Sequence, residues 1–154
     1  MLIREAFPAD LPAASQLWFE RQCLLQQSEP LIQLAPDALS MWQRTASDWL
    51  TDEKAAMFVG ESRGELAGFV AVGICADAAG LQPAWVGRLL AMAVDLHQPH
   101  AALSSQLLEE VEAWLRRHTI EALEIDVPLF YPVEAAFWRG RGARPRSHRY
   151  WLSL

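Results

Sequence analysis

The hydrophobic positions of the first third of the chain recur at helical spacing. After a short apolar strand at 2–6, this spacing predicts helices over about 11–27 and 36–50. Asp10 is suited to cap the first helix, because its carboxylate can accept a hydrogen bond from a free N–H in the first turn. Three tryptophans lie on the apolar stripes of these helices: Trp18, Trp42 and Trp49. They belong to the core if the stripes face the sheet, and otherwise to an interface or a substrate site.

The middle of the chain changes to the pattern of strands. Segments 56–62 and 65–76 are rich in β-branched and aromatic residues, and the turn between them predicts a hairpin. Segment 84–94 alternates between two faces and predicts a third central strand, which ends near Asp95.

The last third of the chain returns to mixed elements. Its pattern predicts an amphipathic helix from about 101 to 117, a buried strand at 122–127, a short helix at 132–142 and a closing strand at 147–154. No repeat or linker interrupts this order. We therefore expect one domain over residues 1–154, of α/β (α+β) class, with helices flanking a mostly antiparallel mixed sheet.

The amino-acid composition limits the kinds of partner and the compartment that we expect for this protein. The net charge of −6 disfavours nucleic acid and acidic membranes, and no uncharged run reaches the ~20 residues that span a bilayer. Cys23 and Cys75 each lie in an apolar segment, which predicts buried thiols in a reducing compartment. Since no signal sequence is recognisable, we expect a cytoplasmic protein.

Three stretches resemble the GCN5-related N-acetyltransferase (GNAT) superfamily. "IREAFPADLPAASQLW" is similar to the family's first strand and helix, "FVGESRGELAGFVAVG" to its second and third strands, and "FWRGRGARP" to a late family segment. The three stretches occur in the family's order and at its spacing over nearly the whole chain. The resemblance implies the acyl-CoA N-acyltransferase fold with acetyl-CoA as co-substrate and no metal.

The resemblance also implies where acetyl-CoA binds. In the family, the main chain of the fourth strand holds pantetheine, and a glycine-rich turn at the start of the third helix holds the pyrophosphate through free N–H groups. The corresponding turn contains no glycine here. It is either a weakened cofactor site or an ordinary loop whose serines satisfy the first helical turn. The positions implied are Met92, Ala93 and Val94 on the strand, and Pro99, His100, Ala101, Ala102, Leu103, Ser104 and Ser105 at the turn.

Catalytic groups are harder to assign. The family often places a tyrosine, as general acid, where this chain has Trp138, and an indole is not a useful proton donor. Trp138 either packs against pantetheine or belongs to the core. Tyr131 and Tyr150 are candidate substitute acids, or simply packing residues. No metal-ligand spacing appears among Cys and His.

The expected activity is transfer of an acetyl group to an amine by direct attack, with a small-molecule or peptide amine as acceptor. The alternative is an inactive GNAT-fold protein that binds a ligand or another chain. The tryptophans of the first two helices would then line either an acceptor pocket or a homodimer surface. The five arginines between 139 and 149 are a solvated surface, a contact for CoA phosphates or, least in keeping with the acidic chain, an RNA contact.

Overall fold

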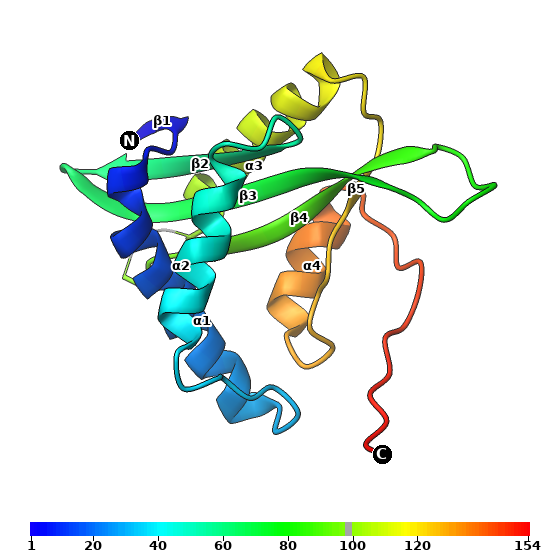
Figure 1. Cartoon of the computed structure of the whole chain (residues 1–154), viewed down its shortest axis with the longest axis horizontal. Helices are drawn as coiled ribbons and strands as arrows, with labels where there is room; N and C mark the ends of the chain where they lie inside the picture. The colour runs from blue at the N-terminus through cyan, green and yellow to red at the C-terminus, as the bar shows by residue number, and fades with distance from the viewer. Residues whose placement is uncertain (98–99) are drawn as a thin grey trace.

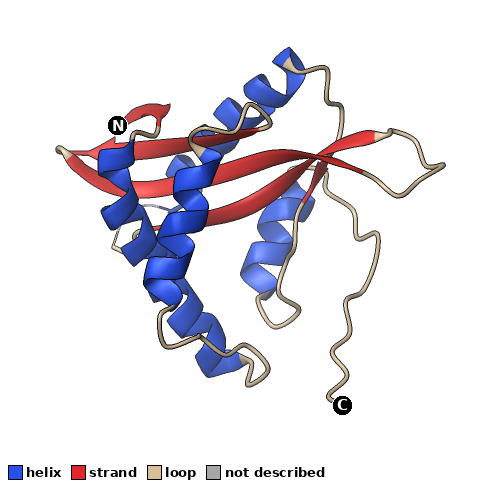
Figure 2. Ribbon diagram, in the orientation of Figure 1, coloured by secondary structure: helices blue, strands red, loops and turns tan. Residues whose placement is uncertain are grey.

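The computed structural model describes residues 1–97 and 100–154, and in these residues a five-stranded sheet lies between two layers of helices (Figures 1 and 2). The strands are β1 (Leu2–Glu5), β2 (Ala55–Ser62), β3 (Glu65–Ala76), β4 (Trp85–Val94) and β5 (Leu123–Glu124). The helices are the 3-10 turn η1 (Pro8–Asp10), α1 (Leu11–Ser28), α2 (Ala38–Trp49), α3 (His100–Arg117) and α4 (Pro132–Gly140).

The sheet has the order β1-β2-β3-β4-β5, so neighbours in sequence are neighbours in space. β1 to β4 pair antiparallel, whereas β5 pairs parallel to β4 because α3 carries the chain back between them. The predicted fold class, a mostly antiparallel mixed sheet flanked by helices, is confirmed.

Alternate residues of β3 enter two different cores. Val70 and Val72 pack toward α3 and α4, whereas Phe69 and Ala71 pack toward α1 and α2. Figure 1 shows α1 and α2 side by side on one face of the sheet and α3 on the other. The continuous apolar runs of β2 and β3 follow from this arrangement, since a central strand covered on both faces needs apolar residues at every position.

Glycines set how closely α3 approaches the sheet. A Cβ atom on Gly60 would lie 2.5 Å from Cδ1 of the fully buried Leu103, and one on Gly68 would lie 3.0 Å from its Cδ2. At the other end of α3, a Cβ on Gly87 would lie 2.7 Å from Cδ2 of Leu115. Because these three glycines have no side chains, both ends of α3 can pack closely against the sheet. This close packing fixes where the helix begins.

The predicted strand at 147–154 is wrong. Residues 144–154 form no strand, and all of them are exposed. The predicted strand at 122–127 is reduced to the two paired residues of β5. Residues 147–154 include aromatic and apolar side chains that favour a strand, but a strand also needs a neighbouring main chain, and among the described residues none pairs with this segment.

The structure bears on two expectations, one about the cysteines and one about membrane-spanning helices. Cys23 on α1 and Cys75 on β3 are free thiols, but both are half-buried rather than buried as predicted. Cys75 lies near the end of β3, where the helical layers no longer cover the sheet. Within residues 1–97 and 100–154, none of the helices has the length and apolar character needed to cross a membrane.

Arg4 ties β1 to η1 and β2. Its guanidinium donates to the two carboxylate oxygens of Asp10 at 2.7 and 2.9 Å and also pairs with Glu61. The Asp10 carboxylate accepts a further bond from the Phe7 N–H at 2.7 Å. It therefore makes no capping bond to α1, contrary to the sequence prediction. The bonds from Arg4, and then from Phe7, hold the pKa of Asp10 below its ordinary value, although partial burial opposes the shift.

We expect Asp10 to make stability depend on pH. Because its pKa is lower in the folded than in the unfolded state, its contribution is present above about pH 4 and is lost as pH falls through the folded-state pKa. Asp10→Asn should cost about 1.5–3 kcal/mol of unfolding free energy at pH 7, and this difference from the parent should shrink as the pH approaches about 2.

Urea unfolding of both proteins across this pH range measures the difference. Asp48→Asn, which changes an exposed carboxylate on α2, is the matched control. A difference between Asp10→Asn and parent that stays constant with pH would show that the Asp10 charge does not stabilise the fold.

Candidate functional site

β4 loses its parallel partner halfway along. β5 pairs with β4 only at Gly87 and Arg88, opposite Leu123 and Glu124. From Leu89 to Val94, no described strand pairs with β4 on that side. Figure 1 shows the chain after β5 running away from β4. The sheet is therefore open along the second half of β4.

A β-bulge lies at the beginning of the open stretch. Ala71 of β3 pairs with Ala91 and Val72 pairs with Leu89, so Leu90 is an extra residue on β4. Leu89 packs toward α3, whereas Leu90 and Ala91 both pack toward α1 and α2. A bulge bends its strand and resets the alternation of side chains. It thus sets the direction in which the second half of β4 runs, while β4 stays paired with β3 as far as Val94.

Main-chain groups of Met92 and Val94 point to the open edge. The Asp95 N–H donates to the carbonyl of Ala67 at 2.8 Å, so residue 95 bonds toward β3. Groups in an antiparallel ladder alternate between the two edges of a strand. The N–H and C=O groups of Met92 and Val94 are therefore directed away from β3, where a ligand can bond to them.

The start of α3 lies close to the end of β4 in sequence. Pro99 lies outside the described residues, and only the backbone of His100, where the helix begins, is described. Ala101 and Ala102 are exposed, Leu103 is buried against the glycines of β2 and β3, and Ser104 and Ser105 are half-buried. Free N–H groups at a helix start favour an anion. The small, exposed residues Ala101 and Ala102 leave the start of α3 accessible to a ligand.

The candidate acid residues lie in different environments. Trp138 is 6% exposed in the core shared by α3 and α4, with its ring 5.3 Å from that of Phe137. Tyr131 is half-buried at the start of α4, next to Phe130. Tyr150 is 88% exposed in the segment 144–154. The chain by itself does not gather these three side chains into one site.

We expect Trp138 to act by packing and not by donating a proton. Trp138→Phe should keep any acetyl transfer within about tenfold of the parent, because a lost general acid typically costs about 10²–10⁴-fold. Its stability cost should be about 1–3 kcal/mol, since a buried side chain becomes smaller. A roughly thousandfold slower reaction, in a folded variant with unchanged affinity for acetyl-CoA, would contradict this assignment.

One ion pair at the open edge escaped sequence analysis. The guanidinium of Arg21 on α1 bonds to the carboxylate of Glu134 on α4 at 2.8 Å. Since α1 and α4 pack on opposite faces of the sheet, this pair joins the two layers around the open side of β4. The two residues are separated by 113 positions, and no local pattern links them.

A hollow of about 340 Å³ lies beside the end of β4. Five residues of α1 and one residue after β4 line it: Gln16, Phe19, Glu20, Cys23, Leu24 and Leu96. Its surface is mainly apolar, and Glu20, which is exposed and accepts a bond from Gln16 at 2.9 Å, provides a carboxylate. An apolar groove with one negative charge is suited to an amine that carries an apolar body.

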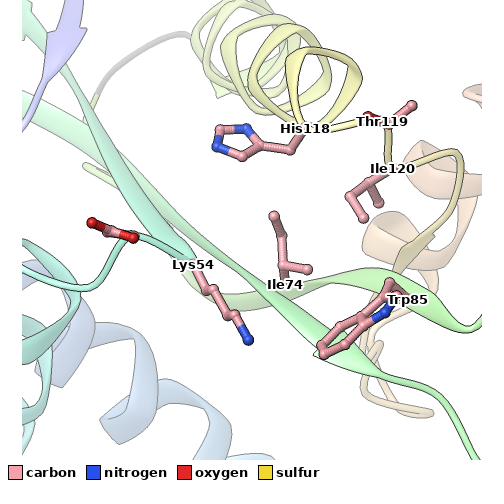
Figure 3. Close-up of a pocket in the computed structure, with 7 residues that line it drawn as sticks. Lys54, Ile74, Trp85, His118, Thr119 and Ile120 are labelled. Carbon is pink, nitrogen blue, oxygen red and sulfur yellow. The ribbon is translucent and has the colours of Figure 1, made fainter.

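A second hollow, of about 410 Å³, lies at the far end of α3 (Figure 3). The Lys54 ammonium lies 4.8 Å from the ring centre of Trp85 at its rim, and Ile74 and Ile120 line its wall. Its residues follow the C-terminal end of α3, precede β2, or lie at the outer ends of β3 and β4. This hollow is thus separate from the open edge of β4 and the start of α3.

The sequence matches the model of the Acetyltransferase (GNAT) family over residues 18–143. The chain belongs to this family, and it is therefore an acyltransferase by family. The expectation drawn from the three sequence stretches is confirmed. No curated protein matches the sequence.

Solved structures share the fold. A tetramutant of the BH1408 protein from Bacillus halodurans is 18% identical, with a TM-score of 0.83 and complete coverage of both chains. An aminoglycoside 6'-N-acetyltransferase from Acinetobacter haemolyticus is 17% identical, with a TM-score of 0.78 over 100% of this chain and 98% of that one. A predicted acetyltransferase from Clostridium acetobutylicum, solved with acetyl-CoA, is 12% identical, with a TM-score of 0.77 over 99% and 94%.

Proposed function

We propose that this protein transfers the acetyl group of acetyl-CoA to an amine. The observation that carries the proposal is the free main-chain edge of Met92 and Val94, next to which α3 begins. An extended amide-containing ligand can bond to such an edge as an added strand would. A negatively charged group continuing from it would meet the start of α3.

These features fit the two halves of acetyl-CoA. The amides of pantetheine match the N–H and C=O groups of Met92 to Val94. The pyrophosphate matches the free N–H groups at the start of α3, from His100 to Ala102, and the hydroxyls of Ser104 and Ser105 can add further bonds. Pro99 has no N–H, so the site has one donor fewer than a turn without proline. Bound acetyl-CoA supplies an activated carbonyl, which an uncharged amine can attack directly when both are held in place.

The hollow beside α1 is proposed to take the acceptor. It adjoins the end of β4, and its apolar wall with Glu20 suits a small-molecule or peptide amine. The Acinetobacter haemolyticus structure is named for an aminoglycoside, but 17% identity supports only the shared fold. An aminoglycoside is therefore one amine to test among several.

Nucleic acid is not proposed as a partner. Three of the arginines between 139 and 149 are bonded to carboxylates: Arg141 to Glu112 at 2.6 Å, Arg146 to Asp77 and Glu124, and Arg149 to Asp126. Neutralised arginines in an acidic chain attract phosphates weakly. We also propose the reducing cytoplasm as the location, because both thiols are free.

An inactive family member that only binds a ligand or another chain is the second candidate. Two observations favour it. The turn before α3 lacks glycine, and the buried Trp138 occupies the position where many family members have a tyrosine that acts as general acid. The first weakens the binding of acetyl-CoA, and the second removes a proton donor from the reaction.

An acetyl-transfer assay distinguishes the two candidates. The purified protein is incubated with acetyl-CoA and an aminoglycoside, a polyamine or a short peptide, and acetylated amine is measured by mass spectrometry. This readout avoids thiol reagents, which would also react with Cys23 and Cys75. Product formed faster than without enzyme supports transfer. Binding of acetyl-CoA without product from any amine would support the inactive alternative.

A further inference from the structure

The second hollow, at the far end of α3, combines an apolar wall with charged groups at its rim. It is formed by segments that are distant in sequence, namely the residues before β2, the outer ends of β3 and β4, and the residues after α3. Figure 3 shows Lys54 and Trp85 on one side, His118 and Thr119 on the other, and Ile74 between them. Its volume of about 410 Å³ lies in the lower part of the roughly 300–1,000 Å³ range of small-molecule sites.

The apolar wall is partly open to solvent and continuous with the core. Trp85 at the start of β4 is 47% exposed, and Ile74 of β3 is half-buried. Ile120 is 9% exposed and belongs to the core between the sheet and α3, against which Ile74 also packs. A branched or aromatic side chain placed in the hollow would contact all three residues. It would also remove exposed surface of Trp85 from water, which favours binding.

The rim carries one positive and one negative side chain, Lys54 and Glu53, that form no ion pair within residues 1–97 and 100–154. The Lys54 ammonium lies 4.8 Å from the ring centre of Trp85. The Lys54 carbonyl accepts a bond from the Ile74 N–H at 2.8 Å, which holds residue 54 beside β3. The rim therefore offers an ammonium and a carboxylate to a ligand.

His118 adds a hydrogen-bond acceptor. Its Nδ1 lies 2.9 Å from the carbonyl oxygen of Trp114, and its ring lies 4.3 Å from the Trp114 ring. Because a carbonyl oxygen only accepts, Nδ1 donates in this bond. The Nε2 atom of the uncharged ring is then left as an acceptor, which suits an ammonium group of a ligand.

Thr119 lines the hollow in a strained conformation. Its φ is +61°, a left-handed value that is costly for a β-branched residue. It ends α3 at a position where glycine is usual, and the next N–H, that of Ile120, bonds back to the Leu115 carbonyl at 2.9 Å. Strain of this kind is common at ligand sites, and here it belongs to a residue that lines the hollow.

We propose that the second hollow binds a small α-amino acid with an apolar side chain. The carboxylate of the ligand pairs with the Lys54 ammonium and accepts a bond from the Thr119 hydroxyl. Its ammonium meets the Glu53 carboxylate and the His118 Nε2, and its side chain packs on the apolar wall. A ligand with one charge leaves a rim charge unmatched, so a zwitterion is the better fit. Since the hollow is separate from the open edge of β4, this ligand is not placed to react with acetyl-CoA.

NMR spectra of the full chain labelled at the isoleucine δ1 methyl groups give the first test. The protein is titrated with L-leucine and with L-phenylalanine in the absence of acetyl-CoA, so the result does not depend on acetyl transfer. At least one of them should shift the Ile74 and Ile120 signals to saturation, with a dissociation constant at or below about 1 mM. The Ile3 signal, from β1, should stay unchanged. No shift at Ile74 and Ile120 with either amino acid at about 10 mM would overturn the proposal.

Analogues and variants test the two charges. For leucine, isocaproate lacks the ammonium and isoamylamine lacks the carboxylate, and each should bind about three- to tenfold more weakly. Lys54→Met and Glu53→Gln should each weaken leucine binding by a similar factor. Arg44→Met, which removes an exposed cation from α2, is the matched control and should have no effect. Equal binding of leucine and isocaproate, or equal affinities of the Lys54 and Arg44 variants, would refute recognition of a zwitterion.

Thr119→Gly separates binding from stability. Glycine adopts a positive φ without strain, so the unfolding temperature should be unchanged or higher. Because the hydroxyl is lost, the affinity for the amino acid should nevertheless fall about two- to tenfold. A variant that is as stable as the parent and binds the amino acid equally well would contradict the role assigned to Thr119.

Discussion

Trp42→Ala is expected to remove about 3–5 kcal/mol from the free energy of unfolding. Trp42 is 8% exposed and lies at the centre of an aromatic cluster. Its ring stacks on Trp18 of α1 at 5.4 Å, meets Trp49 edge-on at 5.8 Å and lies 5.3 Å from Phe69 of β3. One side chain therefore joins α1, α2 and the sheet. Alanine would leave a cavity in contact with all three.

Urea unfolding followed by circular dichroism measures this loss without relying on tryptophan fluorescence. Met41→Ala changes the preceding, exposed residue of α2 and should cost less than about 1 kcal/mol. If Trp42→Ala cost as little as this control, Trp42 would not be core, and its stripe would face a ligand or another chain.

Ser104→Asp is expected to abolish detectable binding of acetyl-CoA. Ser104 is half-buried near the start of α3, where the proposed site receives the pyrophosphate. A carboxylate there repels that group and competes for the same N–H groups. The variant should remain folded, because a negative charge near a helix N-terminus stabilises the helix.

Two further variants separate charge from position. Ser104→Ala removes only a hydroxyl and keeps the free N–H groups of the helix start, so the affinity for acetyl-CoA should fall by less than about tenfold. Gln106→Asp adds the same charge to an exposed position two residues later and should weaken binding far less than Ser104→Asp. Equal loss in both aspartate variants would show that the site is not built around the first residues of α3.

The elements that were predictable from sequence are those with a local cause. The apolar stripe of residues 36–50 identifies α2 and its central Trp42, and the β-branched runs identify the hairpin of β2 and β3. The order of elements then fixed the fold class. The first-turn cap at Asp10 was mispredicted because Arg4, from a different element, bonds to the carboxylate.

Features that depend on distant residues could not be predicted. The extra residue Leu90 lies in an unbroken apolar run, and the end of pairing after Arg88 depends on where β5 turns away. Arg21 and Glu134 meet only because two helical layers come together beside β4. Residues 147–154 have side chains that favour a strand, but whether another main chain lies beside them cannot be judged from a local window of sequence.

The site residues rest on family resemblance more than on local physics. Met92 and Val94 now have a structural reason to bind a ligand, namely their free main-chain groups. For Ser104 and Ser105, the structural reason to bind a ligand is their place near the accessible start of α3. The roles of Tyr131 and Tyr150 stay predictions.

Calorimetric titration of the unmodified protein with acetyl-CoA tests the central claim most directly. The start of α3 retains free N–H groups whatever its side chains, while the missing donor at Pro99 costs about 1.5–3 kcal/mol. Binding should therefore be roughly ten- to a hundredfold weaker than at a glycine-rich turn, but measurable, with a matching rise in thermal stability. Absence of both heat and thermal shift at millimolar acetyl-CoA would contradict the account.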